Sequence, residues 1–455
     1  MSTVSLPTVP PAPKVHAKDL PAWRLVLEFS RNNVATMPED AFDALIRRRR
    51  VFGVDTLAVS DPDGVWHVLA TAAAKYKRPI AAHRILGPLG GQGVLLAEQA
   101  EWRRQRRMLA PVFTPTSVDV LLPHFSDAAA DLIRRIEDLP RANLSAAFQE
   151  TTLEAVLRAL FSLPDSSRRH GLASMVRGYL TGPGRPNVLD GFVRTEDGFA
   201  FALRKRRRFQ ADWRAVVDGI VAERRLAQAS SQRGDLLDLL LAARDADSGE
   251  ALSDTEVRDQ CATMLVAGYE TTGRLLFWAC YLLTLDVAEQ ARLRAEILAF
   301  SPERVVKLDD LLKWPRLRQM LLETLRLYPP VAQISREAIA DDIVAGEPVR
   351  PRTQIWISPW VMHRHRKFWD NPTAFIPDRF AGKPSPWSAG GAFLPFGVGP
   401  RICIGATFAL AEAQIILATL LSRFNVTLDD ARPVLPVAKV TTAPSFEPMF
   451  QLERR

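Results

Sequence analysis

The segment Phe396-Gly397-Val398-Gly399-Pro400-Arg401-Ile402-Cys403-Ile404-Gly405 precedes an apolar run over residues 406–421. Its three glycines and one proline exclude the interior of a helix or of a central strand, because glycine is entropically costly there and proline lacks a backbone N–H. The segment is therefore predicted to be a loop that passes close to a flat ligand and presents Cys403 just before a helix. Amide groups at a helix N-terminus favour negative charge, so we expect Cys403 to exist as a thiolate.

Local chemistry leaves three interpretations of Cys403. A thiolate held in this way is an axial ligand that pushes electron density into a haem iron and favours O–O cleavage. A single cysteine is also commonly a small buried hydrophobe. A phosphate-binding loop is disfavoured, because that signature requires Lys-Ser/Thr after its last glycine, whereas Gly405 is followed by Ala406-Thr407.

The pattern Phe-x-x-Gly-x-Arg-x-Cys-x-Gly closely resembles the haem-binding loop of the cytochrome P450 family, and every fixed position is filled, by Phe396, Gly399, Arg401, Cys403 and Gly405. Further motifs in the family's order extend the resemblance over roughly residues 20–450. The resemblance implies the cytochrome P450 fold of the soluble bacterial type, with a long central helix over the haem. It also implies haem b (iron protoporphyrin IX) as the cofactor and Cys403 as the iron ligand.

Composition is that of a globular protein, with 455 residues of which 47% are hydrophobic and 24% charged. The cysteines Cys261, Cys280 and Cys403 form no CxxC pair, which argues against a disulfide framework or a zinc site. Residues 1–17 are rich in proline and polar, and charges interrupt the apolar runs elsewhere within ~18 residues. We therefore expect no signal peptide, no membrane anchor and a cytoplasmic location.

The formal net charge of +8 is concentrated in three arginine-rich runs, at residues 47–50, 103–107 and 204–208. Nucleic-acid binding is one interpretation, but no zinc-finger, RNA-recognition or basic-zipper pattern accompanies the runs. Solvated helix faces, or a docking surface for an acidic protein, are favoured instead.

Along the chain, residues 1–20 are expected to form an extended arm and residues 21–455 a single haem-binding domain that is mainly α with a small β part. Periodicity over residues 22–49 predicts helices, and residues 80–98, with four glycines, predict a long functional loop. The capping box from Ser253 to Glu256 opens a helix that continues to about Leu285, roughly 45 Å in length. Residues 331–358 are expected to contain strands, and residues 368–395 an irregular coil.

Within that long helix, Ala267-Gly268-Tyr269-Glu270-Thr271-Thr272 places an acid, a hydroxyl and a glycine in an apolar stripe. Gly268 would let a planar ligand approach the backbone, and the Thr271 hydroxyl can bond the Ala267 carbonyl and locally open the helix. A kink in a core helix is the simpler interpretation of these residues taken alone. They resemble the oxygen-activation motif of the family, which implies that Glu270 and Thr271 relay protons to dioxygen.

Glu323 and Arg326 lie three residues apart on one helix face, which in isolation is a weak surface pair. They resemble the Glu-x-x-Arg motif of the family, whose buried pair also binds an arginine in the coil before the cysteine loop. Arg379 fits that third position, so the resemblance implies an assembly triad that holds the coil beneath the haem.

A buried haem requires partners for its two propionates. By resemblance these are Trp102 and Arg106 of a Trp-x-x-x-Arg helix, Arg336 and Arg401, while Ala267, Gly268, Phe396 and Gly405 complete the cofactor-binding set. Each arginine taken alone could equally be a surface residue. His363 could reach the haem edge, although a structural role is favoured for it.

The resemblance implies a monooxygenase that inserts one atom of O2 into a lipophilic small molecule by hydroxylation. Electrons would come from a ferredoxin or flavodoxin with its reductase, and no reductase is expected in this chain, which ends about fifty residues after Cys403. A hydroperoxide-driven peroxygenase is an alternative, disfavoured because Glu270-Thr271 is intact, and a non-catalytic haem sensor or carrier would not need that pair. By position, the pocket walls would be residues 80–98, 182–192, Val266-Ala267, 331–334 and Ser445-Phe446, which do not identify the substrate.

Overall fold

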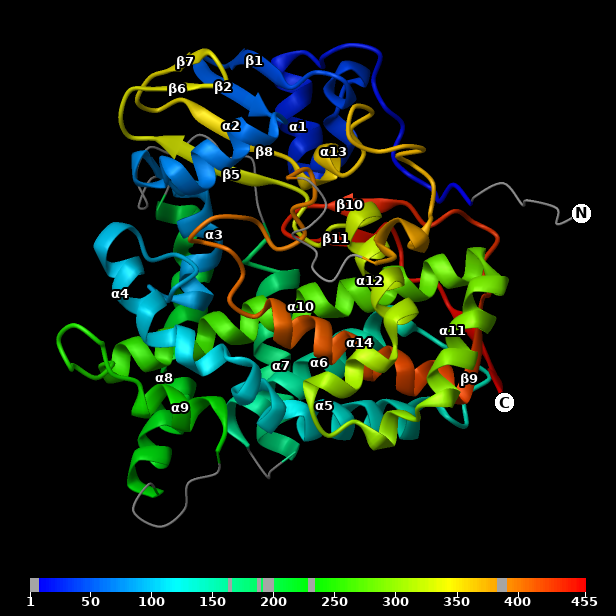
Figure 1. Ribbon diagram of the computed structural model, residues 1–455. Coiled ribbons are helices and arrows are strands. Elements are labelled where there is room, and N and C mark those ends of the chain that lie inside the picture. Colours follow the sequence, from blue (N-terminus) through cyan, green and yellow to red (C-terminus); the bar gives the residue numbers. More distant parts are fainter. Residues whose placement is uncertain (1–7, 163–165, 186–189, 191–199, 228–233, 383–390) are drawn as a thin grey trace, which may run out of the picture.

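The computed structural model describes residues 8–162, 166–185, 190, 200–227, 234–382 and 391–455. Its longest helix, α10 (Asp254–Leu285), crosses the middle of the molecule (Figure 1). The predicted capping box is present, because the Ser253 side chain accepts a hydrogen bond from the Glu256 N–H and the Glu256 carboxylate accepts one from the Ser253 N–H. Most of the second half of α10 is buried, and the predicted bounds of this helix are confirmed.

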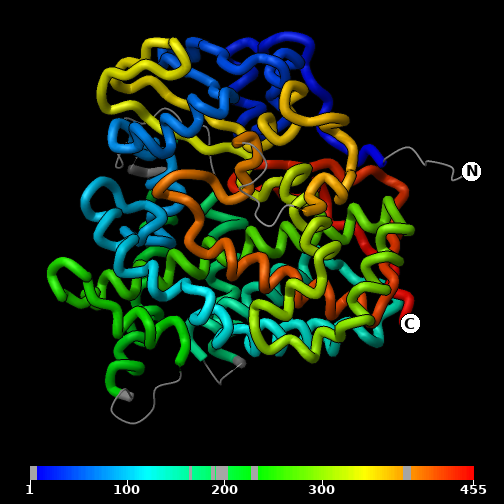
Figure 2. Tube along the Cα trace, in the orientation of Figure 1, coloured from blue at the N-terminus to red at the C-terminus, as the bar shows by residue number. Residues whose placement is uncertain are grey.

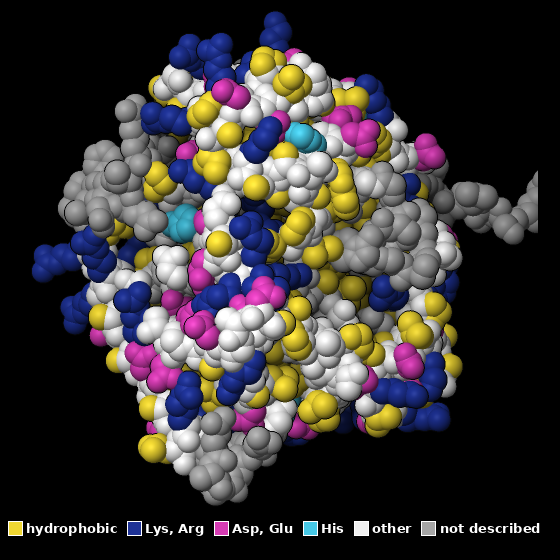
Figure 3. All heavy atoms as spheres, turned by 60° about the vertical axis from the view of Figure 1, so that its left-hand side comes forward, with side chains coloured by type: hydrophobic (Ala, Val, Ile, Leu, Met, Phe, Trp, Pro, Cys, Tyr) yellow, Lys and Arg dark blue, Asp and Glu magenta, His cyan; other side chains and the backbone are white. Residues whose placement is uncertain are grey.

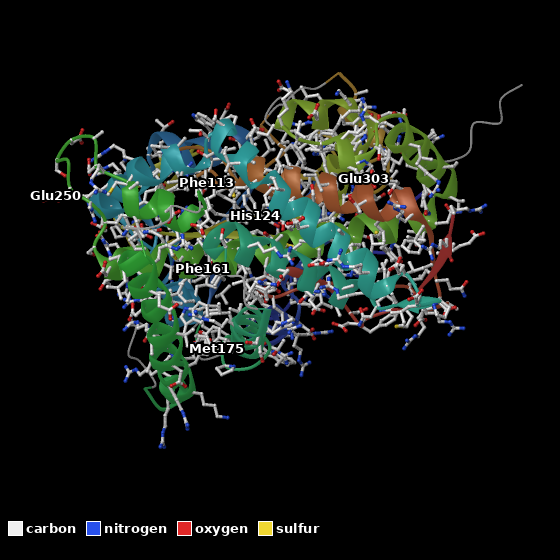
Figure 4. All side chains as sticks on the ribbon, turned by 90° about the horizontal axis from the view of Figure 1, so that it is seen from below. Phe113, His124, Phe161, Met175, Glu250 and Glu303 are labelled. Atoms are coloured by element: carbon white, nitrogen blue, oxygen red, sulfur yellow. The ribbon has the colours of Figure 1, made fainter. Side chains whose placement is uncertain are left out.

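Helices surround α10 on several sides. Helix α6 (Leu144–Phe161) packs along it, and α5 (Pro115–Ile136) packs against both α6 and α14 (Ala406–Arg423), as the view from below shows (Figure 4). The ring of Phe125 meets that of Phe408 edge to face at 4.6 Å, an arrangement that aromatic pairs prefer. Helix α14 is apolar and long enough to cross a membrane by length and composition, but 67% of it is buried inside the fold.

The largest sheet has the strand order β1-β2-β8-β5-β3 and lies at one end of the molecule (Figure 1). In this order β8 is Gln354–Ile357, β5 is Ile334–Ala338 and β3 is Tyr76–Lys77. Its edge strand β1 (Ile46–Val51) pairs with β2 (Val54–Val59) through a turn in which Phe52 and Gly53 have positive φ angles. The prediction of a helix up to residue 49 is therefore wrong at its end. Three of the β1 arginines, Arg47 to Arg49, form ion pairs with residues from elsewhere, such as Arg47 with Asp19, and an arginine-rich edge resists pairing with other chains.

Residues 80–90 form helix α3 (Ile80–Gly90), so the predicted loop is wrong over this stretch. Pro88 lies inside the helix and cannot donate to the Arg84 carbonyl four residues earlier. That carbonyl instead accepts a hydrogen bond from the Arg206 guanidinium at 3.2 Å, and the Gly90 carbonyl accepts one from Thr263 of α10. Side chains distant in sequence thus stabilise a helix that its own glycines and proline disfavour.

The described part of the N-terminal arm runs along the surface of the domain. The Tyr328 hydroxyl donates to the Pro11 carbonyl, and the Phe375 N–H donates to the Thr8 carbonyl. The division into an arm of residues 1–20 and one domain of residues 21–455 stays a prediction.

The remaining elements complete a mainly helical fold with small sheets, as predicted. The other described α-helices are α1 (Ala22–Arg31), α2 (Pro62–Trp66), α4 (Gln99–Leu109), α7 (Ser166–Thr181), α8 (Ala200–Ala227), α9 (Leu236–Ala242), α11 (Val287–Ala299), α12 (Pro315–Leu327) and α13 (Pro359–Met362). The other strands are β4 (Arg141–Ala142), β6 (Asp342–Val344), β7 (Glu347–Val349), β9 (Phe424–Leu428), β10 (Pro436–Ala438), β11 (Thr442–Pro444) and β12 (Phe450–Arg454). Within the predicted coil of residues 368–395, residues 383–390 lie outside the described part of the chain.

Candidate functional site

The predicted loop before α14 is present, and two of its glycines have positive φ, 74° at Gly397 and 75° at Gly399. Gly399 also approaches the backbone closely, since a Cβ there would lie 2.3 Å from the Leu69 carbonyl oxygen. The Cys403 N–H donates to the Phe396 carbonyl at 3.0 Å, and Gly405 is the N-cap of α14. In Figure 2 this orange segment lies beside the region of α4, and its contacts with residues 97–102 agree with that placement.

The Cys403 side chain is exposed although it lies deep within the fold. Burial raises the pKa of its thiol, while the Gly405 N–H and the nearby Arg106 guanidinium act in the opposite direction. Within the chain alone, burial therefore opposes ionisation of the thiol, and the expected thiolate stays a prediction. A cation that coordinates the sulfur would supply the missing charge, since a coordinating thiol is deprotonated.

The middle of α10 brings together the residues of the predicted acid–hydroxyl pair. The Thr271 hydroxyl donates to the Ala267 carbonyl at 2.8 Å, as expected, while α10 continues without a break. The Glu270 carboxylate accepts a hydrogen bond from the Thr441 hydroxyl at 2.7 Å and lies 3.7 Å from the Arg274 guanidinium. Ala267 is exposed, although most other residues of α10 are buried. Cys403, which precedes α14, is exposed as well.

Gly268 has a different role from the one that we expected. A Cβ at this position would lie 3.0 Å from Cγ2 of Val156, so the glycine allows α10 to pack closely on α6. Its lack of a side chain thus serves helix packing, and the expected approach of a planar ligand to this face of the helix is not supported.

Three arginines converge from different parts of the chain, and two of them, Arg336 and Arg401, are predicted site residues. The third is Arg78, whose Nη1 has no hydrogen-bond partner among the described residues. Burial, followed by the charge of the neighbouring arginines, lowers the pKa of Arg78 to about 9 and that of Arg336 to about 10. Glu98 is the carboxylate among them, with its Oε2 2.6 Å from Nη2 of Arg401.

This cluster fits the two carboxylates of a haem, because three guanidiniums and one carboxylate leave a net charge of +2 in a buried place. The Arg401 guanidinium lies over the ring of Trp102, with its Cζ 4.5 Å from the ring centroid. Arg106 interacts electrostatically with Cys403, so it lies near the sulfur. Phe396 and Gly405 flank the cysteine as expected, Phe396 being partly buried against the core.

The predicted assembly triad is confirmed as a structural unit. Arg326 and Glu323 form two parallel hydrogen bonds of 2.7 Å, and both side chains are fully buried. Arg379 Nε lies 3.4 Å from the same carboxylate, while Arg326 also binds the Pro372 and Ala374 carbonyls of the coil.

His363 has the structural role that the sequence favoured. Its Nε2 accepts the Leu394 N–H at 2.8 Å, and burial lowers its pKa to about 3. The ring is therefore neutral and links α13 to the segment that leads into the cysteine loop.

Comparison with known proteins decides the family. The cytochrome P450 family model matches residues 45–446. The chain belongs to the cytochrome P450 family. It is 30% identical to cyclooctatin synthase of Streptomyces melanosporofaciens over 79% of this chain and 77% of that protein. It is equally 30% identical to a cytokinin hydroxylase of Arabidopsis thaliana, over 78% and 71% respectively, and to human cytochrome P450 4F8, over 82% and 76%.

The crystal structure of the cytochrome P450DA heme domain superposes with a TM-score of 0.80 at 23% identity, covering 99% of this chain and 98% of that one. The fold is therefore that of a cytochrome P450. With a hydroxylase and a synthase among its relatives, the protein is a cytochrome P450 monooxygenase, an oxidoreductase with a haem cofactor.

Arg78, Glu98 and Thr441 are site residues that sequence reasoning missed. Glu98 and Thr441 lie far in sequence from their partners, 303 residues from Arg401 and 171 residues from Glu270 respectively. No local pattern marks them, so only the folded arrangement identifies them.

Proposed function

We propose that this cytochrome P450 uses haem b, held by Cys403, to hydroxylate a lipophilic small molecule with O2. The observation that carries the proposal is the acid–hydroxyl pair Glu270-Thr271 on α10, the helix against which the cysteine helix α14 packs. When bound and reduced, haem supplies the redox chemistry that activates dioxygen, with the cysteine thiolate favouring O–O cleavage. Residues Arg78, Arg336 and Arg401 would hold its carboxylates.

The chain's own contribution to the reaction is the supply of protons. The Thr271 hydroxyl hydrogen is committed to the Ala267 carbonyl, so its oxygen is left to accept a hydrogen bond from a water molecule. The Glu270 carboxylate is 15% exposed and is held by Thr441, so it can exchange protons with solvent and pass them to that water. An intact pair of this kind favours O2 chemistry over a hydroperoxide-driven peroxygenase and over a sensor or carrier.

Removal of the Thr271 hydroxyl tests this function. Thr271→Ala should still consume reduced cofactor but release peroxide in place of hydroxylated product, because the oxygen atom that holds the proton-delivering water is lost. Thr419→Ala is a matched control, since Thr419 makes the same bond to the carbonyl four residues earlier, but in α14. Glu270→Gln should slow turnover by about 10²–10⁴-fold. If Thr271→Ala forms as much hydroxylated product per reduced cofactor consumed as the wild type, the hydroxyl has only a structural role in the helix.

We further propose that electrons come from a ferredoxin or flavodoxin with its reductase and that the protein works in the cytoplasm. Apolar residues of the expected pocket walls, such as Val266 and Val331, support a lipophilic substrate. Of the expected wall 182–192, residues 186–189 and 191–192 lie outside the described part of the chain. A screen for compounds that change the haem spin state would identify the substrate class.

A further inference from the structure

Glu98 lies between two of the three arginines of the cluster and binds both. Its Oε2 is 2.6 Å from Nη2 of Arg401, and the other guanidinium nitrogen of Arg401 donates to the adjacent Ala97 carbonyl at 2.9 Å. Its Oε1 accepts a hydrogen bond from the backbone N–H of Arg78 at 3.0 Å and lies 3.9 Å from Nη1 of the Arg78 guanidinium. One carboxylate thus hydrogen-bonds the guanidinium of Arg401 and the backbone of Arg78, with the Arg78 guanidinium close by.

A purely structural role as a helix cap does not account for this side chain. Glu98 is the N-cap residue of α4, but its carboxylate makes no capping hydrogen bond to the first turn. The next residue, Gln99, has a φ of 49°, a conformation that non-glycine residues rarely adopt. The chain therefore accepts an unfavourable backbone where it directs the carboxylate of Glu98 to the arginines and away from the helix.

The charges of the cluster show what this carboxylate does. Without Glu98 the three guanidiniums would carry +3, whereas with it they carry +2, which two haem carboxylates neutralise. Glu98 is only 24% exposed and Arg401 13%, so water screens their charges weakly. A fixed negative charge this close to the haem carboxylates disfavours the addition of an electron to the iron.

We propose that Glu98 is a positioning residue that holds Arg78 and Arg401 toward the haem carboxylates and, through its charge, lowers the reduction potential of the haem. This inference rests on the proposed function only in requiring that haem binds above Cys403. Glu98 lies outside the family's haem-binding motifs, and it would help to set how readily the enzyme accepts its first electron.

The test is a redox titration of the substrate-free holoenzyme, which needs neither the substrate nor the natural electron donor. Glu98→Gln keeps the size of the side chain and removes its charge, so it should favour the reduced form by about threefold to tenfold at an effective dielectric constant of about 20. A tenfold change corresponds to about 59 mV. Glu101→Gln is the matched control, because Glu101 lies in the same helix but is half exposed and pairs with Arg104.

Two further variants separate charge from packing. Glu98→Asp keeps the charge and should have a potential close to that of the wild type. Arg78→Gln should shift the potential in the opposite direction, and combining it with Glu98→Gln restores the net charge of +2 and should return the potential toward the wild-type value. If Glu98→Gln loads haem poorly, the single Arg78→Gln variant and Glu98→Asp still test the direction of the charge effect.

An unchanged potential in Glu98→Gln, or equal shifts in Glu98→Gln and Glu98→Asp, would overturn the proposal. These outcomes are distinct from failure of the proposed function, which would show as the lack of a thiolate-ligated haem in the wild-type protein before any titration.

Discussion

At the scale of single residues, buried groups whose ionisation is fixed by their surroundings hold the site together. His363 is the clearest case, with its pKa lowered to about 3 by burial and then by the charges of Arg326 and Arg364. In the unfolded chain a histidine titrates near 6.5, so below that pH the unfolded state takes up a proton that the folded state refuses. The stability that the neutral ring contributes is therefore complete above pH 6.5 and is lost as the pH falls toward 3.

We predict that the free energy of unfolding decreases by about 1.4 kcal/mol for each pH unit below 6.5 because of His363. His363→Gln retains an acceptor for the Leu394 N–H but does not titrate, so its unfolding should lack this component. Denaturant unfolding of both proteins at pH 7.5 and pH 5 gives, for each of them, the slope of the free energy of unfolding against pH. Identical slopes would mean that the ring is protonated in the folded protein.

At the scale of elements, the long helix and the cysteine loop could be predicted from sequence because their signals are local. The capping box marks the start of α10 within the residues that form it, and the glycines mark the loop. Helix α3 could not be predicted, because the donors that satisfy its carbonyls, such as Arg206 and Thr263, lie more than a hundred residues away. The same reason hides Glu98 and Thr441, whose roles exist only after the chain has folded.

The triad that joins α12 to the coil before the cysteine loop should be essential for assembly. Glu323→Ala leaves Arg326 buried with an uncompensated charge, and breaking a buried pair in this way costs about 3–5 kcal/mol. The variant should yield little haem-loaded protein, as measured by the ratio of haem to protein absorbance after purification. Glu303→Ala removes the exposed pair with Arg423 and should change stability by less than about 1 kcal/mol, so normal loading of both variants would contradict the assembly role.

At the scale of the whole molecule, the arginine-rich runs do not form a single basic field. Basic and acidic side chains are intermixed on the face shown in Figure 3. Arg104 pairs with Glu101 and Glu256, and Arg107 pairs with Asp245 and Asp247. A docking role for Arg103, Arg104 or Arg107 stays a prediction, and of these three Arg103 is exposed and has no ion pair among the described residues.

We predict that Arg103 contributes to docking of an acidic electron carrier. The rate of reduction by a ferredoxin or flavodoxin should decrease as ionic strength rises, because exposed charges are screened beyond about 8–10 Å. Arg103→Gln should lower the rate at low salt and flatten this dependence, whereas Arg134→Gln, which changes an exposed arginine in the last turn of helix α5, should not. Salt-independent reduction of the wild-type protein would argue against electrostatic docking.

The most direct test of the whole account is the absorption spectrum of the reduced protein with carbon monoxide. Cys403 is the cysteine of the glycine-rich loop, while Cys261 and Cys280 are fully buried in α10. The wild type should show the strongly red-shifted band of a thiolate-ligated haem, and Cys261→Ala and Cys280→Ala should keep it while Cys403→Ser abolishes it. A wild-type band typical of histidine-ligated haem, or a red-shifted band that survives in Cys403→Ser, would contradict the assignment of Cys403 as the ligand.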